Sequence, residues 1–130
     1  MLSLKDLKNI GFKQCAFWRL RDNLPFLEGE IPKKPSIYLF VVANMVRYVG
    51  KADDTLNQRL HSYERRMRGN KPFRPVHDGI RDALKNGPEV AVFTLDISGP
   101  RVIKSEGLPL DRLVGIEAGL IETINPDWNP

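Results

Sequence analysis

Cysteine and histidine are scarce in this 130-residue sequence, which holds one cysteine, Cys15, and two histidines, His61 and His77. A lone cysteine cannot form an internal disulfide, and neither histidine stands at ligand spacing from a second histidine or a cysteine. The sequence therefore argues against a zinc site and against a disulfide-stabilised secreted fold. We expect a soluble, cytoplasmic protein.

Other signatures are missing as well. The longest apolar run, residues 37–43, is far shorter than the ~20 residues that span a bilayer. The leucines near the N-terminus alternate with lysine and aspartate, unlike the continuous apolar segment of a signal peptide. We find neither a glycine-rich phosphate loop nor a serine-nucleophile elbow, so nucleotide hydrolysis and serine hydrolase chemistry lose their usual support. We expect no membrane partner.

The composition is that of one folded domain. Hydrophobic residues make up 42% and charged residues 28% of the chain, which are values typical of globular proteins. Twenty Lys and Arg against sixteen Asp and Glu give a net charge of +4. That excess permits a polyanionic partner without requiring one.

Residues 1–34 predict a short helix, a strand and a proline-rich loop. Ser3 is a suitable N-cap for the helix, and Gly11 ends it. Over residues 12–21 apolar side chains alternate with other residues, so we favour a strand. Three prolines between residues 23 and 35 predict an irregular loop.

The segment from residue 36 to 43 is rich in β-branched and aromatic residues and is apolar on both faces, which predicts a central strand. Ala43-Asn44 predicts a tight turn, and residues 46–49 predict the returning strand of a hairpin. Periodicity and turn residues predict the other elements: helices over residues 54–68, 75–86 and 110–124, a strand over 90–97 and a loop over 98–109.

A glutamate interrupts the apolar face of the last predicted helix. Glu117 lies four residues after Leu113 and four before Ile121, in the middle of the apolar stripe. A carboxylate there costs several kcal/mol unless it is paired or binds a cation. It is either the structural partner of an arginine or a metal ligand or catalytic carboxylate lining a cleft. Gly115 and Gly119 weaken a helix, so we expect close packing to require them.

Basic residues recur on the two middle helices. Arg59 and Tyr63 lie four apart and share one helix face, where an arginine could clamp a phosphate or simply face solvent. On the next helix His77, Arg81 and Lys85 repeat every four residues. This stripe is compatible with a nucleic-acid backbone and equally with an ordinary solvated face.

The spacing of several residues resembles the GIY-YIG nuclease family. Ser36-Ile37-Tyr38 is followed ten residues later by Tyr48-Val49-Gly50, and then by Arg59, Tyr63, Glu117 and Asn129. Within that family the sequence is similar to the N-terminal incision domain of the excinuclease C subunit, here as a stand-alone small domain. The resemblance covers about residues 35–130. Ser36 stands where the motif has its first glycine.

The resemblance implies an α/β fold of the α+β type, with a small central three-stranded antiparallel-type sheet flanked by helices. It also implies roles for individual residues. Glu117 would bind the metal ion, which is Mg²⁺ or Mn²⁺. Tyr38 would activate the attacking water with support from Tyr48, and Arg59 would bind the scissile phosphate.

Three further site residues follow from the same resemblance. Tyr63 occupies a position where relatives have Tyr or His, and Lys51 matches a commonly retained lysine. Asn129 would either orient Glu117 or pin the C-terminal segment. The residues predicted to bind DNA are Arg59, Arg66, Arg74, His77, Arg81 and Lys85.

We therefore predict a metal-dependent endonuclease that hydrolyses DNA phosphodiester bonds in repair, restriction or mobile-element processing. Residues 1–34 would form an N-terminal extension packed on the core, and residues 35–130 the nuclease domain. The oligomeric state stays open between a monomer and a weak dimer. The alternative is a catalytically inactive module of the same fold that binds nucleic acid or docks to a partner.

Overall fold

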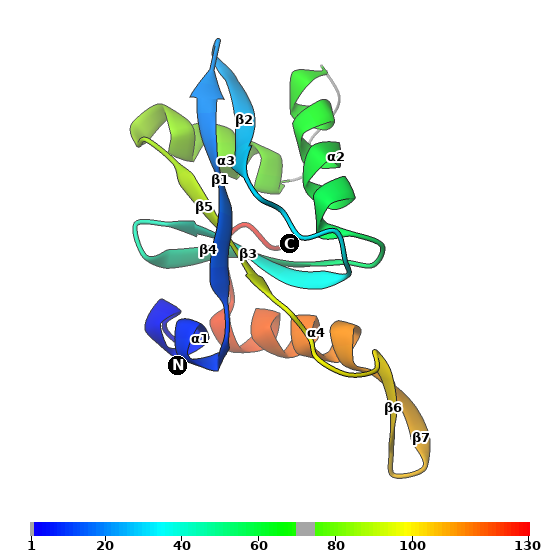
Figure 1. Cartoon of the computed structure of the whole chain (residues 1–130). Coiled ribbons are helices and arrows are strands. Elements are labelled where there is room, and N and C mark those ends of the chain that lie inside the picture. The colour runs from blue at the N-terminus through cyan, green and yellow to red at the C-terminus, as the bar shows by residue number, and fades with distance from the viewer. Residues whose placement is uncertain (1, 70–74) are drawn as a thin grey trace.

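A five-stranded antiparallel sheet forms the centre of the computed structural model, which describes residues 2–69 and 75–130 (Figure 1). The strand order is β2-β1-β5-β3-β4, and β6 and β7 form a separate two-stranded sheet. The helices are α1 (Leu4–Ile10), α2 (Leu56–Arg68), α3 (Pro75–Asn86) and α4 (Arg112–Ile124). The strands are β1 (Lys13–Arg21), β2 (Leu24–Gly29), β3 (Ser36–Val42), β4 (Met45–Ala52), β5 (Val90–Leu95), β6 (Val102–Ser105) and β7 (Leu108–Asp111).

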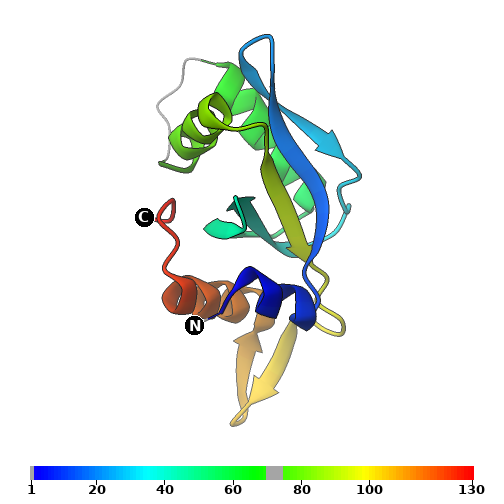
Figure 2. The ribbon, with the colours of Figure 1, turned by 90° about the vertical axis from the view of Figure 1, so that its left-hand side faces the viewer.

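Strand β3 is buried on both faces, as its sequence predicts. Tyr38 and Phe40 point into a core shared with α2 and α3, whereas Ile37 and Leu39 point into a second core shared with α1 and α4. This alternation follows from the two-residue period of a strand. The helices accordingly cover the two faces of the sheet in pairs (Figure 2).

The expected three-stranded sheet is wrong, because residues 1–34 contribute two of the five strands. The strand predicted over residues 12–21 is confirmed as β1, which pairs with both β2 and β5. The loop predicted over residues 23–35 contains β2, with Pro25 inside it. Proline is tolerated there because β2 is an edge strand, where a missing N–H breaks no inner ladder.

The loop predicted over residues 98–109 is also wrong in part, since β6 and β7 form a hairpin. Its turn residues Glu106 and Gly107 both have positive φ, at 55° and 77°, which suits a two-residue hairpin turn. This hairpin projects away from the main sheet (Figures 1 and 2), and the side chains of both strands are largely exposed.

The turn at Ala43-Asn44 is confirmed, with φ of 50° and 64° at its two central residues. The hairpin it closes sets Phe40 opposite Tyr48 and Tyr38 opposite Gly50. The last helix begins at Arg112 rather than at residue 110, because Asp111 caps it and Leu110 belongs to β7. None of the described helices is long and apolar enough to cross a membrane.

Candidate active site

A pocket of about 440 Å³ opens beside the edge strand β4, between the start of α2 and the middle of α4. Tyr48 and Lys51 reach it from β4, Arg59 from α2 and Glu117 from α4. These four residues were predicted to belong to one site, and the fold brings them together from three elements. The other lining residues are Ala52, Asp53, Asp54, Thr55 and Gln58.

Three tyrosines and an arginine form a connected cluster at the back of this pocket. The hydroxyl oxygens of Tyr38 and Tyr63 share a hydrogen bond of 2.8 Å, and Arg59 Nε donates to Tyr38 Oη at 3.4 Å. The Arg59 guanidinium also lies 5.3 Å from the centroid of the Tyr63 ring. Tyr48 packs against Tyr38 with ring centroids 6.0 Å apart. The prediction that Tyr38 and Tyr48 share one sheet face is confirmed.

Burial separates the roles that the two motif tyrosines can play. Tyr38 is 0% exposed and does not line the pocket, whereas Tyr48 does. Desolvation raises the pKa of Tyr38 well above its usual value. The neighbouring Tyr48 adds to the increase, and Arg59 and the hydrogen bond with Tyr63 oppose it. Desolvation also raises the pKa of Tyr63. The raised pKa favours the neutral phenol at Tyr38, whose hydroxyl oxygen accepts from Arg59 Nε behind the pocket.

Gly50 leaves room for the Tyr38 ring across the β3–β4 ladder. A Cβ atom at Gly50 would lie 2.4 Å from Tyr38 Cζ and 2.6 Å from Tyr38 Oη, closer than any normal contact. The motif glycine is thus required by packing, since the fully buried ring has little space to move away.

We expect Gly50→Ala to destabilise the fold by about 1–3 kcal/mol and to displace Tyr38 from Arg59, because overpacking forces side chains off their rotamers. Urea unfolding measures the effect. Gly119→Ala on α4 is the matched control, because nothing lies within 4 Å of its added Cβ. It should stabilise the protein by up to about 1 kcal/mol. Equal losses in both variants would contradict the packing role of Gly50.

The expectation that close packing requires Gly115 and Gly119 is wrong. Neither Gly115 nor Gly119 meets another atom within 4 Å of a built Cβ, so close packing does not require them. The packed face of α4 is formed by Leu113, which is buried, and by partly buried residues, whereas Val114 is exposed. The partly buried residues of this face are Ile116, Leu120, Ile121 and Ile124.

Glu117 lies beside this packed face and is half-buried. Desolvation raises the pKa of its carboxyl group. The Lys51 ammonium, the Lys51 backbone N–H and the Arg59 guanidinium oppose the increase, and Asp53 adds to it. Among the described residues, no ion pair within 4 Å includes Glu117, and an arginine partner of this kind is therefore not observed. The carboxylate lines the pocket, next to the backbone N–H of Lys51.

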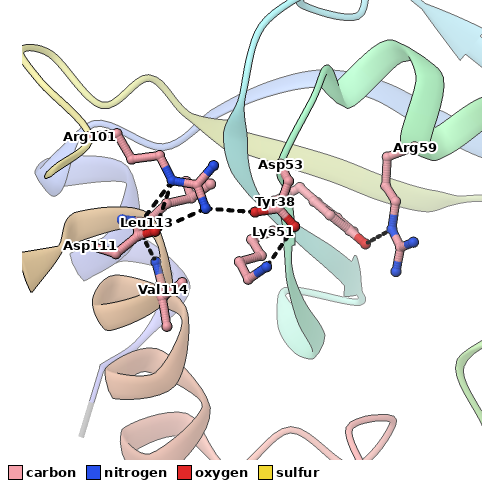
Figure 3. Close-up of polar contacts among 8 residues, drawn as sticks. All are labelled: Tyr38, Lys51, Asp53, Arg59, Arg101, Asp111, Leu113 and Val114. Atoms are coloured by element: carbon pink, nitrogen blue, oxygen red, sulfur yellow. Dashed lines mark hydrogen bonds and ion pairs between the residues drawn. The ribbon is translucent and has the colours of Figure 1, made fainter.

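Asp53 is a pocket residue that sequence reasoning missed. Its Oδ2 accepts a hydrogen bond from Lys51 Nζ at 2.7 Å, and its Oδ1 accepts one from Arg101 Nη2 at 2.7 Å (Figure 3). The hydrogen bond from Lys51, followed by that from Arg101, lowers the pKa of Asp53. Its position two residues after Lys51 is a weak signal, because charged residues after a strand are common.

Asn129 pins the C-terminal segment instead of orienting Glu117. Its side-chain amide donates to Val49 O at 2.9 Å and accepts from Val49 N at 3.0 Å, as a neighbouring strand would. Trp128 N also donates to Arg47 O at 2.9 Å. The C-terminal residues therefore cover the open edge of β4, which would otherwise expose unpaired backbone groups.

The predicted DNA-binding residues do not all lie on one exposed surface. Arg59 and Arg66 line a small depression next to Tyr63, and Lys85 is exposed on α3. His77 is only 2% exposed and packs edge-on against Tyr63, so it does not belong to a solvated stripe. The Arg81 guanidinium donates to the carbonyl of Met67 and so links α3 to α2. Arg74 lies outside the described residues.

Comparison with known proteins identifies the fold. No protein-family model and no curated protein sequence matches the chain. Among solved structures, a mutant of bacteriophage T4 EndoII superposes with a TM-score of 0.78 over 99% of this chain and 100% of that one, at 18% identity. The restriction endonuclease HPY188I in complex with product DNA superposes with a TM-score of 0.55 over 95% of this chain and 82% of that one, at 16% identity.

The chain therefore has a GIY-YIG-like nuclease fold, as the spacing of its motif residues indicates. The match to EndoII extends over residues 1–34 as well, which agrees with the integration of β1 and β2 into the main sheet. At these identities the likeness shows the fold, and the activity has to be argued from the pocket.

Proposed function

We propose that the protein is a divalent-metal-dependent endonuclease of the GIY-YIG type that hydrolyses DNA phosphodiester bonds. The observation that carries this proposal is the pocket shared by Tyr48, Arg59 and Glu117. A carboxylate, a guanidinium and a phenol are the groups that phosphodiester hydrolysis needs to bind a cation, stabilise the phosphate charge and move a proton. A binding module has no need of a half-buried carboxylate that lines a pocket beside an arginine.

The pocket fits Mg²⁺ or Mn²⁺ better than it fits zinc. Among the described residues, no group of three or more His, Cys, Asp or Glu side chains could hold a metal ion by itself. Mg²⁺ is commonly bound by one or two carboxylates, with waters and substrate phosphates as its other ligands. Glu117 would supply the carboxylate. The ion would polarise a phosphate oxygen and stabilise the charge that develops on it.

The protein's own residues would bind the phosphate and move the proton. Arg59, held by Tyr38, would bind the scissile phosphate and stabilise the negative charge of the transition state. Tyr48 faces the pocket, so we assign it the proton of the attacking water, and Tyr38 the positioning of Arg59. Lys51 lies on the pocket wall, where its ammonium group would attract the DNA backbone.

A plasmid-nicking assay tests the proposed activity. We expect cleavage of supercoiled DNA with Mg²⁺ or Mn²⁺ and none in EDTA, and forked and single-stranded substrates would define the preferred structure. Binding of the same DNA without cleavage under every metal condition would contradict the enzyme and support a catalytically inactive binding module.

The DNA path is predicted to include Arg66 and Lys85, which lie on the two helices that cover the same sheet face as Arg59. Replacing both by alanine should lower the slope of log affinity against log salt by about 2, because each lost phosphate contact releases about one counterion fewer. Fluorescence anisotropy over a salt series measures the slope.

The matched control is Lys5→Ala with Lys13→Ala, which removes the same charge from exposed positions on α1 and at the start of β1. We expect this control to change the slope little. Equal changes in the two double variants would show that net charge, and not a path along α2 and α3, determines binding. Arg81 is unsuitable for this test because its guanidinium joins α3 to α2.

A further inference from the structure

The Arg101 guanidinium connects two segments that carry pocket residues, the end of β4 with Asp53 and the start of α4, the helix of Glu117. Arg101 precedes β6 and contacts two carboxylates (Figure 3). On one side its Nη2 donates to Asp53 Oδ1 at 2.7 Å. On the other, its Nε lies 3.1 and 3.0 Å from the two oxygens of Asp111, and its Nη2 lies 3.0 Å from Asp111 Oδ2.

Each of these carboxylates fixes a second group. Asp53 holds the ammonium of Lys51 at 2.7 Å, and both residues line the pocket. Asp111 is the N-cap of α4, where its Oδ1 accepts from the backbone N–H groups of Leu113 and Val114 at 3.0 and 3.1 Å. A cap of this kind fixes where a helix begins and how its first turn is oriented.

Helix α4 carries Glu117 six residues after its cap, which is about 9 Å along the helix axis. The position of Asp111 therefore determines where the Glu117 carboxylate enters the pocket. In the same way, the position of Asp53 determines where the Lys51 ammonium lies in the pocket. Arg101 is the residue that ties the two carboxylates to each other.

We propose that Arg101 is a positioning residue of the active site, which sets the separation between Glu117 on α4 and the Lys51–Asp53 wall. This inference rests on the proposed function of the pocket. It implies that the segment before the β6–β7 hairpin affects catalysis, although this segment contains none of the motif residues that line the pocket. Arginine suits the role because its planar fork reaches two carboxylates at once, whereas a lysine ammonium is a single point of contact.

The test compares Arg101→Met with Arg112→Met. Arg112 anchors the same connection, because its Nη1 donates to Ser98 O at 2.7 Å and Pro100 O at 3.0 Å, but it does not touch Asp53. We expect Arg101→Met to raise the Mg²⁺ concentration for half-maximal cleavage and to lower the single-turnover rate. Together the two changes should reduce cleavage by about 10–100-fold. Arg112→Met should leave both unchanged apart from a lower Tm.

Two readouts do not depend on cleavage. In Arg101→Met, the Tm should rise only at higher Mg²⁺ concentrations than in the wild-type protein. Arg101→Lys should restore only part of the wild-type Mg²⁺ response. In a double-mutant cycle on this Mg²⁺ dependence, adding Arg101→Met to Asp53→Asn should change little, because Arg101 acts through its contact with Asp53. These results would support positioning even if the wild-type protein bound Mg²⁺ and failed to cut DNA, an outcome that would reject the enzyme alone.

Three outcomes would overturn the inference. One is a lower Tm in Arg101→Met with the Mg²⁺ dependence and the rate per folded molecule unchanged, since that is a purely structural role. Another is full additivity with Asp53→Asn. The third is a wild-type protein that neither binds Mg²⁺ nor cleaves DNA, which would overturn the proposed function as well.

Discussion

Replacing Glu117 by glutamine should reduce DNA cleavage by about three orders of magnitude, which corresponds to about 4 kcal/mol of lost transition-state stabilisation. Glutamine keeps the shape of the side chain and removes the charge that would bind the metal ion. DNA binding in EDTA should stay near that of the wild-type protein. Nicking assays and anisotropy on the same preparations measure the two effects.

Stability distinguishes a metal ligand from a structural glutamate. Burial raises the pKa of Glu117, so its ionised form is disfavoured in the folded state and opposes folding at neutral pH. Glu117→Gln should therefore melt at or slightly above the wild-type temperature without metal, and it should lose the Mg²⁺-dependent increase in Tm.

Glu122→Gln provides the control, because Glu122 is an exposed glutamate on the same helix. It should change neither cleavage nor the Mg²⁺-dependent shift. A Glu117→Gln protein that melts early and still cuts DNA in proportion to its folded fraction would refute the metal-ligand assignment. It would also restore the alternative of a structural glutamate.

The sequence predicts the elements that local pattern determines. β3 is recognisable because every residue after Ser36 is aliphatic or aromatic, and the Ala43-Asn44 turn because Asn44 readily adopts positive φ. β2 is missed because Pro25 indicates a loop unless the strand is known to lie at an edge of the sheet. That knowledge depends on the strand order, which the local sequence does not contain.

The residues of the site also divide into those that a local pattern reveals and those that it does not. Glu117 stands out because it interrupts an apolar helix face, and the resemblance to a nuclease family joins it to Tyr48 and Arg59. The Arg101–Asp53 pair gives no such signal. Its two residues are 48 positions apart, both are partly exposed, and charged residues in connecting segments are common. Only the folded chain shows that they meet beside the pocket.

The two motif tyrosines should differ in what their hydroxyl groups contribute. We expect Tyr48→Phe to lower the single-turnover rate by about 10²–10⁴-fold, because removing a general base costs that much and Tyr48 is the tyrosine that lines the pocket. The DNA affinity and the Tm should change little. Saturating Mg²⁺ and DNA isolate the chemical step.

Tyr38→Phe should act on binding and stability instead. It removes the acceptor of Arg59 Nε and leaves the Tyr63 hydroxyl without its 2.8 Å partner, which costs about 1–3 kcal/mol for a buried polar group. We expect a lower Tm, weaker DNA affinity through a less ordered Arg59, and a smaller loss in the chemical step than Tyr48→Phe shows.

The pair of variants is informative in either direction, because each removes one oxygen atom and leaves the ring in place. If Tyr38→Phe abolishes cutting at saturating DNA while Tyr48→Phe cuts at nearly the wild-type rate, water activation belongs to Tyr38, and the DNA complex must open its buried hydroxyl to solvent. If Tyr48→Phe alone abolishes cutting, the tyrosine that lines the pocket takes the proton, and Tyr38 behind it holds Arg59 against the phosphate.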